Sequence, residues 1–225
     1  PPRLMFRKSP AASVKLLRQS NPHQKLYEWG RAVPIDYTAL GQSLRGTLYY
    51  PANYTPEKKY PMIVQIYERQ SQYINDYNFP TNHEQGGFNI TDYTARGYAV
   101  LLPDIVYEKG KPGPSALACT LAAVDAVLQK GFVDPQRLGL IGHSFGGYET
   151  LYILTQTNRF AATVAGAAWS ALTSAYFSVN TDDQQPDMWR LEQQQLRIGQ
   201  PFFDNPEPYF DNTPLWQASK VQTPL

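Results

Sequence analysis

The sequence predicts an α/β fold in which a mostly parallel sheet carries helices on both faces. Three observations support this prediction: short apolar runs typical of buried strands, longer stretches with apolar residues at helical spacing, and the alternation of the two along the chain. Strands that alternate with helices form a parallel sheet that the helices cover on both sides. At 225 residues, the chain is long enough to bury one substantial core.

The first half of the chain contains most of the strand-like runs. Residues 33–37, 44–50 and 62–67 are short and apolar, and a polar Lys-Lys-Tyr-Pro turn precedes the third. Residues 68–96 are polar and aromatic, which predicts a long loop with one short helix. Residues 98–102 form the next expected strand, and we interpret Asp104, just after it, as a carboxylate that anchors a loop.

The second half contains the helical patterns. Ser115 follows Pro114 and is the expected N-cap of a helix over residues 115–130, where leucines and a valine recur on one face. Gly131 occupies the left-handed position that commonly ends such a helix. The remaining expected elements are a strand at 137–141, a helix at 145–156, a strand at 161–167 and a surface helix at 186–197 closed by Gly199.

Composition narrows the classes of function. The formal net charge is +1 without a basic block, which argues against a nucleic-acid partner. No apolar run reaches the roughly 18 residues of a membrane span, and the N-terminal residues lack the apolar stretch of a signal peptide. Cys119 is the only cysteine, so an internal disulfide is impossible. Asp182 and Asp183 lack partners at metal-ligand spacing, so neither a metal nor another cofactor is expected.

Residues 142–146, Gly-His-Ser-Phe-Gly, match the Gly-x-Ser-x-Gly nucleophile elbow of the α/β-hydrolase fold. The expected strand at 137–141 lies directly before this motif and the expected helix directly after it. Such a turn strains the serine backbone, and the flanking glycines avoid collisions with the neighbouring strand and helix. The sequence therefore predicts Ser144 as a nucleophile, with the backbone N–H of Phe145 facing a developing oxyanion.

The histidines do not complete a catalytic triad. A hydrolase of this fold places Asp or Glu and then His after the nucleophile, whereas His23, His83 and His143 all precede Ser144. We interpret His143 as packed under the elbow, His83 as solvated and His23 as part of an N-terminal turn. Either the triad is completed by residues beyond Leu225, or the protein is a non-catalytic relative.

Several longer motifs carry a family resemblance. The Phe-Val-Asp-Pro-x-Arg run at 132–137 and the Gly-His-Ser-Phe-Gly-Gly-Tyr-x-Thr run at 142–150 are joined by Arg-Gly-Tyr-Ala-Val at 96–100 and Thr-Pro-Leu at 223–225. Together with the runs between 205 and 218, they make residues 61–225 resemble the prolyl oligopeptidase family of serine peptidases, which includes dipeptidyl peptidases and acylaminoacyl peptidases.

The resemblance implies roles for further residues. Tyr67 is similar in position to a family tyrosine whose hydroxyl is the second oxyanion donor, although Glu-Arg-Gln at 68–70 replaces the usual Gly-Gly-Pro. In relatives, aromatic residues after the sixth strand line the substrate pocket. The residues that fall in that region here, together with the one following the nucleophile, are Phe145, Trp169, Leu172, Tyr176 and Phe177.

The same resemblance implies a domain organisation. Residues 1–32 are similar to the end of a preceding β-propeller and its linker, and residues 33–225 to a hydrolase domain that stops before the catalytic Asp and His. We expect a serine peptidase acting on short peptides, and we expect the 225 residues alone to be inactive. A serine esterase or lipase of the same fold and a non-catalytic binding module are the alternatives. Oligomeric state and compartment stay open, with a secreted or periplasmic location favoured only by the resemblance.

Overall fold

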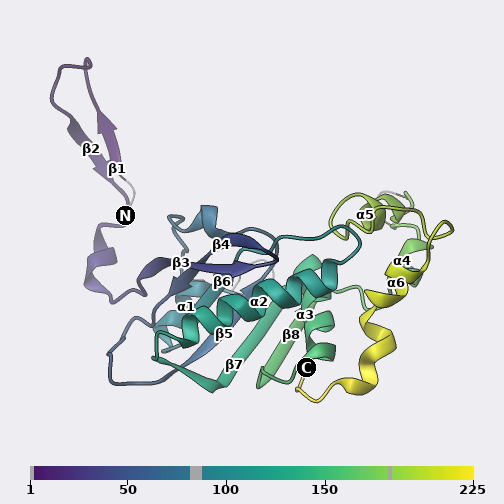
Figure 1. Cartoon of the computed structure of the whole chain (residues 1–225). Helices are drawn as coiled ribbons and strands as arrows, with labels where there is room; N and C mark the ends of the chain where they lie inside the picture. The colour runs from purple at the N-terminus through teal and green to yellow at the C-terminus, as the bar shows by residue number, and fades with distance from the viewer. Residues whose placement is uncertain (1–2, 82–87, 182–183) are drawn as a thin grey trace.

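The computed structural model describes residues 3–81, 88–181 and 184–225, and all structural statements below concern these residues. They form a six-stranded sheet and a separate two-stranded ribbon (Figure 1). The strands are β1 (Arg3–Phe6), β2 (Lys15–Gln19), β3 (Ala32–Ala39), β4 (Gln42–Tyr49), β5 (Tyr60–Ile66), β6 (Ala99–Pro103), β7 (Val133–His143) and β8 (Ala162–Gly166).

Helices and short 3₁₀ turns connect these strands. The α-helices are α1 (Ile90–Ala95), α2 (Pro112–Leu128), α3 (Phe145–Gln156), α4 (Leu172–Tyr176), α5 (Met188–Glu192) and α6 (Glu207–Asp211). The 3₁₀ turns are η1 (Pro22–Leu26), η2 (Ser71–Tyr73) and η3 (Pro214–Lys220). Within the described residues, no helix has the length and apolar character needed to span a bilayer.

The order of the large sheet is β3-β4-β6-β5-β7-β8. The pairs β3–β4 and β4–β6 are antiparallel, whereas β6–β5, β5–β7 and β7–β8 are parallel. The crossovers between parallel strands run through α1, α2 and α3. The predicted α/β architecture with a mostly parallel sheet is therefore confirmed, with the antiparallel part confined to one side.

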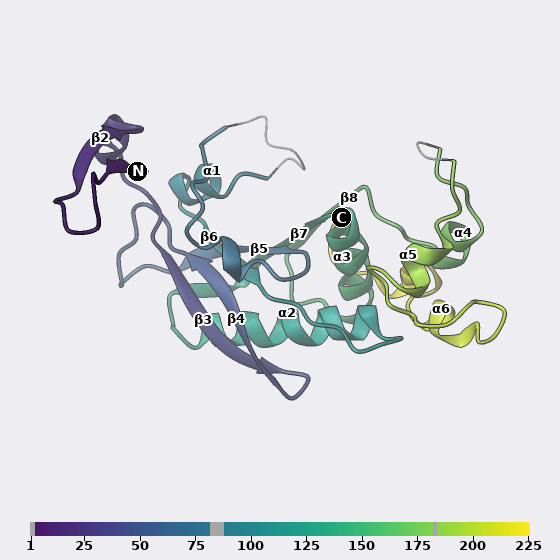
Figure 2. The ribbon, with the colours of Figure 1, turned by 90° about the horizontal axis from the view of Figure 1, so that it is seen from above.

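Side chains along β5 alternate between the two faces of the sheet and show what covers each face. Met62, Val64 and Ile66 are at most 1% exposed and pack in the main core with the buried side of α2. Ile63 points to the other face, where a smaller cluster includes Tyr93 of α1. Figure 2 shows α1 on one side of the sheet and α2 and α3 on the other, which confirms helices on both faces.

Two predicted helix boundaries were wrong. The long helix begins at Pro112 rather than after Ser115, because proline is well tolerated in a first turn that needs no N–H donor. Ser115 is buried inside the helix, where its hydroxyl accepts a hydrogen bond from the Glu108 N–H at 3.0 Å. The surface helix predicted over 186–197 is shorter and consists of α5, Met188–Glu192. It ends early because Leu196 and Ile198 pack in a second core cluster.

The N-terminal ribbon of β1 and β2 projects away from the large sheet (Figure 1). Its strands pair in antiparallel register, and their apolar side chains face solvent on both sides. Leu4, Phe6 and Leu17 are 61%, 52% and 53% exposed, respectively. The ribbon occupies the segment expected to end a preceding β-propeller, and that assignment stays a prediction.

Gly131 offers a clean test of the helix-ending conformation. Its φ is +78°, and an added Cβ would meet no heavy atom within 4 Å, so a substitution tests backbone strain alone. We expect Gly131→Ala to lower the free energy of unfolding by about 1 kcal/mol, which is a fall of roughly 2–4 °C in Tm for a chain of this size. Gly131→Asn is the matched control and should lose less, because asparagine tolerates this region. Equal Tm values for wild type and Gly131→Ala would contradict the assignment.

Candidate active site

Ser144 is the single residue between the end of β7 and the start of α3. Its backbone angles are φ 57° and ψ −118°, a conformation that non-glycine residues rarely adopt. Its N–H donates to the Gly166 carbonyl of β8 at 2.8 Å, and its carbonyl accepts from the Tyr148 N–H at 3.1 Å. The expected strand–helix junction with a strained serine is therefore confirmed, and hydrogen bonds to two elements hold it in place.

Three glycines make this turn sterically possible. A Cβ on Gly142 would lie 2.0 Å from the carbonyl oxygen of Gly146, and a Cβ on Gly146 would lie 2.3 Å from that of Ile66. A Cβ on Gly147 would lie 2.5 Å from the carbonyl oxygen of Gly166. These backbone oxygens cannot move away cheaply, so any side chain here would force β5, β7, β8 and α3 apart. The expected role of the flanking glycines is confirmed, and Gly147 joins them.

A cavity of about 1020 Å³ opens in front of Ser144. The side chain of Ser144 is exposed, and Tyr67, Tyr107 and Arg197 line the cavity with it. His143 also lines it and is exposed, so the expectation that it packs under the elbow was wrong. The reason is the alternation of β7, which buries Gly142 and turns the next side chain outward.

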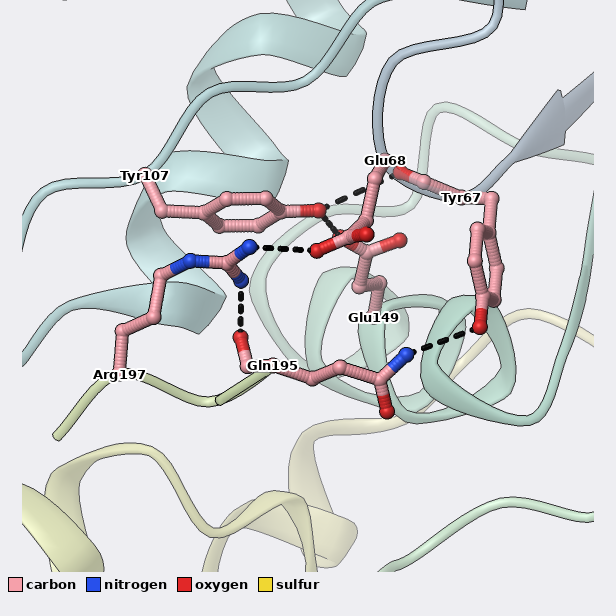
Figure 3. A network of polar contacts seen from close by, with 6 residues as sticks. All are labelled: Tyr67, Glu68, Tyr107, Glu149, Gln195 and Arg197. Atoms are coloured by element: carbon pink, nitrogen blue, oxygen red, sulfur yellow. Dashed lines mark hydrogen bonds and ion pairs between the residues drawn. The ribbon is translucent and has the colours of Figure 1, made fainter. Parts of the chain in front are cut away.

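Tyr67 comes directly after β5 and lies beside the elbow. Its ring packs edge-on against Phe145, with 6.4 Å between the ring centroids. A Cβ on Gly146 would lie 3.3 Å from Tyr67 Cδ2, so the glycine leaves room for the aromatic ring. The Tyr67 hydroxyl accepts a hydrogen bond from Gln195 Nε2 at 2.9 Å (Figure 3). The structure thus brings Tyr67 and the N-terminal end of α3 to the same cavity.

Polar contacts fix the loop after Tyr67, which lacks the expected glycines. The Asp104 carboxylate accepts hydrogen bonds from the N–H groups of Gln70 and Ser71 at 2.7 and 2.8 Å and from the Ser71 hydroxyl at 2.6 Å. This confirms Asp104 as a loop anchor. Glu68 forms an ion pair with Arg197 at 2.6 Å. Backbone N–H groups and the Ser71 hydroxyl therefore attach the loop to Asp104, directly after β6, and the Glu68 side chain attaches it to the segment after α5.

A buried acid lies behind this loop. Glu149 of α3 is fully buried, and its Oε1 lies 2.5 Å from the hydroxyl of Tyr107. That hydroxyl also lies 3.3 Å from the backbone carbonyl oxygen of Tyr67, and the guanidinium of Arg197 stacks over the Tyr107 ring (Figure 3). Because one hydroxyl hydrogen cannot serve two acceptors, a protonated Glu149 completes the chain by donating to Tyr107, which donates to Tyr67.

Burial sets the protonation of this acid. Desolvation raises the pKa of Glu149 well above its ordinary value, and the hydrogen bond that Tyr107 donates to the carboxylate when Glu149 is ionised opposes this only partly. The nearby Glu68 carboxylate raises the pKa further, and Arg197 lowers it. We therefore expect the carboxyl to keep its proton at pH values where exposed glutamates are ionised. Sequence reasoning missed Glu149, although an acid at a helix position flanked by buried residues is a visible signal.

Most of the residues expected to line the substrate pocket are buried in a core cluster. Phe145, Leu172 and Tyr176 are 4%, 0% and 2% exposed and belong to the second core cluster, against which Trp169 also packs. Phe177 is 55% exposed and contacts the ring of Tyr176. None of these five lines the cavity in the part of the chain that is described. Their contribution to substrate binding stays a prediction.

The end of the chain runs beside the edge strand β8. The N–H and hydroxyl of Thr163 donate to the Pro224 carbonyl at 2.9 and 3.1 Å, and the Thr223 hydroxyl donates to the Phe160 carbonyl at 3.0 Å. His83, Asp182 and Asp183 lie outside the described residues.

Replacing the buried acid should change how stability depends on pH. A carboxyl whose pKa is raised by folding stabilises the fold only while it is protonated, so the contribution of Glu149 to stability should fall as pH rises above about 4. Glu149→Gln keeps the shape and a donor but cannot ionise. We expect the variant to match wild type near pH 4 and to gain up to about 1.4 kcal/mol per pH unit above it, until the native pKa is reached.

Urea unfolding at a series of pH values measures this difference. The exposed Glu57→Gln is the matched control and should follow wild type at every pH. A Glu149→Gln curve parallel to wild type would show that Glu149 is ionised in the folded protein.

Comparison with known proteins shows that the sequence is similar to those of peptidases. Residues 109–225 match the sequence profile described as "Prolyl oligopeptidase family". The "Uncharacterized peptidase YuxL" of Bacillus subtilis is 28% identical over 194 residues, which cover 84% of this chain and 28% of that protein. Human prolyl endopeptidase FAP is 27% identical over 146 residues, covering 58% of this chain and 19% of that protein. The chain thus spans less than a third of the length of these relatives.

Solved structures agree on the fold. Acylaminoacyl peptidase of Pyrococcus horikoshii superposes with a TM-score of 0.73 at 19% identity, covering 94% of this chain and 34% of the other. Dipeptidyl peptidase 4 of Porphyromonas gingivalis superposes with a TM-score of 0.64 at 20% identity, covering 93% and 29%. The predicted α/β-hydrolase fold is confirmed.

Proposed function

The chain belongs to the prolyl oligopeptidase family, and we propose that it carries the nucleophile of a serine peptidase that hydrolyses peptide bonds in short peptides. The observation that supports this most strongly is Ser144, exposed to a cavity on a strained turn that three glycines make possible. A fold stores such strain where it serves a function. A related acylaminoacyl peptidase was solved with Z-Gly-Gly-Phe-chloromethyl ketone, and a peptide substrate is proposed here by that similarity.

The proposed reaction passes through an acyl-enzyme. Ser144 Oγ attacks the carbonyl carbon of the scissile bond while its proton goes to a histidine, and the carbonyl oxygen becomes an oxyanion. The Phe145 N–H, left without an intrahelical partner at the start of α3, and the Tyr67 hydroxyl are the two proposed donors to that oxyanion. Collapse of the intermediate releases the amine with the proton from the histidine. Water then cleaves the Ser144 ester by the same route.

The proton acceptor is proposed to come from the longer protein. Within the printed sequence, no histidine follows Ser144, and His143 is its immediate neighbour. The relatives are more than three times as long as the matched region, and the Pro224 carbonyl already accepts a hydrogen bond from Thr163 of β8. We place the triad Asp and His after Leu225. The exposed apolar ribbon of residues 3–19 supports the further proposal that residues 1–32 join a preceding β-propeller.

Fluorophosphonate labelling tests the nucleophile. We expect the full-length protein to be labelled and its Ser144→Ala variant to be unlabelled. Residues 1–225 alone should react poorly and show no measurable peptidase activity, because a serine without a base holds almost no alkoxide at neutral pH. One labelling gel with both lengths and both Ser144→Ala variants is sufficient. Strong Ser144-dependent labelling of the short chain would place the base inside it, and His83 would be the first residue to replace.

Tyr67→Phe tests the second oxyanion donor. In the full-length protein, we expect kcat to fall by about ten- to a thousandfold, an interval that includes the roughly hundred- to thousandfold loss typical of removing one such donor. The matched control is Tyr73→Phe, which removes a hydroxyl from another tyrosine that lines the same cavity. If the two variants have equal turnover, Tyr67 is only a packing residue at the end of β5.

A further inference from the structure

The hydroxyl of Tyr67 has a partner that the proposed mechanism does not use. Gln195 Nε2 lies 2.9 Å from Tyr67 Oη, although 128 positions separate the two residues in the sequence. An amide nitrogen can only donate, so the phenol oxygen is the acceptor in this contact. The single hydrogen of the hydroxyl is then left for another acceptor. On Figure 3, the two side chains meet tip to tip.

The segment that carries Gln195 is fixed by the three residues that follow it. Leu196 and Ile198 are 0% and 2% exposed and belong to the second core cluster. The backbone carbonyl of Gln195 accepts a hydrogen bond from Arg197 Nη1, while Arg197 Nη2 pairs with Glu68 at 2.6 Å. Arg197 thus joins the segment of Gln195 to Glu68, the residue that follows Tyr67. These contacts hold the Gln195 side-chain amide within hydrogen-bond distance of the Tyr67 hydroxyl.

The backbone and the ring of Tyr67 are also fixed by neighbouring residues. The Tyr107 hydroxyl donates to the Tyr67 backbone carbonyl at 3.3 Å and is itself bonded to Glu149. The ring edge packs against Phe145. With the backbone and the ring fixed, the remaining freedom is rotation of the hydroxyl hydrogen about the C–O bond.

We infer that Gln195 is a positioning residue that orients the Tyr67 hydroxyl toward the oxyanion. By donating to the phenol oxygen, the amide occupies one acceptor position, so the hydroxyl hydrogen points away from Gln195 and into the cavity that holds Ser144. The contact also polarises the phenol and makes its hydrogen a better donor. This inference rests on the proposed function, in which Tyr67 stabilises the oxyanion.

Two substitutions in the full-length protein test the inference, with the rate of labelling by an alkyl fluorophosphonate as the readout. Gln195→Met keeps the size and removes the donor, and it should slow the chemical step of labelling by about two- to tenfold, the equivalent of one hydrogen bond, with little change in the binding step. Gln195→Glu introduces an acceptor that draws the Tyr67 hydrogen away when ionised. Its loss should be larger at pH 8 than near pH 4, about the ordinary pKa of glutamate, where a protonated carboxyl can still donate.

The matched control is Gln194→Glu, which makes the same change at an exposed neighbour. We expect its pH profile to follow wild type, since a structural or general electrostatic effect would move both variants. Identical profiles for Gln195→Glu and Gln194→Glu would overturn the inference. Because the comparison is of profile shapes, a modest loss of folded protein in either variant does not hide the result.

Combining Gln195→Met with Tyr67→Phe separates this inference from the proposed function. If Gln195 acts through the hydroxyl, Gln195→Met should have no further effect once Tyr67→Phe has removed it. Additive losses would overturn the inference while leaving Tyr67 as a donor. If Tyr67→Phe alone labels at the wild-type rate, the oxyanion role of Tyr67 fails, and the inference fails with it. Full labelling of Ser144→Ala would instead remove the nucleophile assignment.

Discussion

The close approach of backbone to backbone around the elbow is the constraint on which the site depends. At Gly142, Gly146 and Gly147, an ordinary side chain would penetrate a carbonyl oxygen of a neighbouring segment. The contact between Gly146 and the Ile66 carbonyl matters most, because Ile66 ends β5 and Tyr67 follows it. The same approach that permits the turn therefore brings the proposed oxyanion tyrosine next to the nucleophile.

The polar network around Tyr67 contributes more to position than to stability. The Arg197–Glu68 pair is 38% and 33% exposed, and ion pairs in such surroundings contribute about 0–1 kcal/mol. Glu149 is buried, with Oε2 unpaired among the described groups, and such a group normally destabilises a fold. These contacts yield little net stability, yet they meet at the carbonyl and hydroxyl of Tyr67 and at the adjacent Glu68. Such an arrangement is more consistent with a role at the active site than with a role in stability.

Sequence reasoning succeeded where structure is local. The strand, elbow and helix over β7 and α3, and the left-handed Gly131, follow from residues within a few positions of one another. It failed where tertiary contacts decide the local structure. The segment after α5 leaves its helical pattern because Leu196 and Ile198 are drawn into a core that the local sequence does not reveal. Nor could spacing show that Gln195 meets Tyr67, since that contact depends on how a distant loop folds back over the sheet.

The ribbon of β1 and β2 has a consequence for handling the protein. Two strands alone are at best marginally stable in water, and here both faces present apolar side chains while the outer edges lack strand partners among the described residues. Leu4, Phe6, Leu16 and Leu17 together form the kind of surface that proteins normally cover. A preparation of these 225 residues should therefore scatter light increasingly as it is concentrated, and removing residues 1–31 should improve its colloidal behaviour without touching β3.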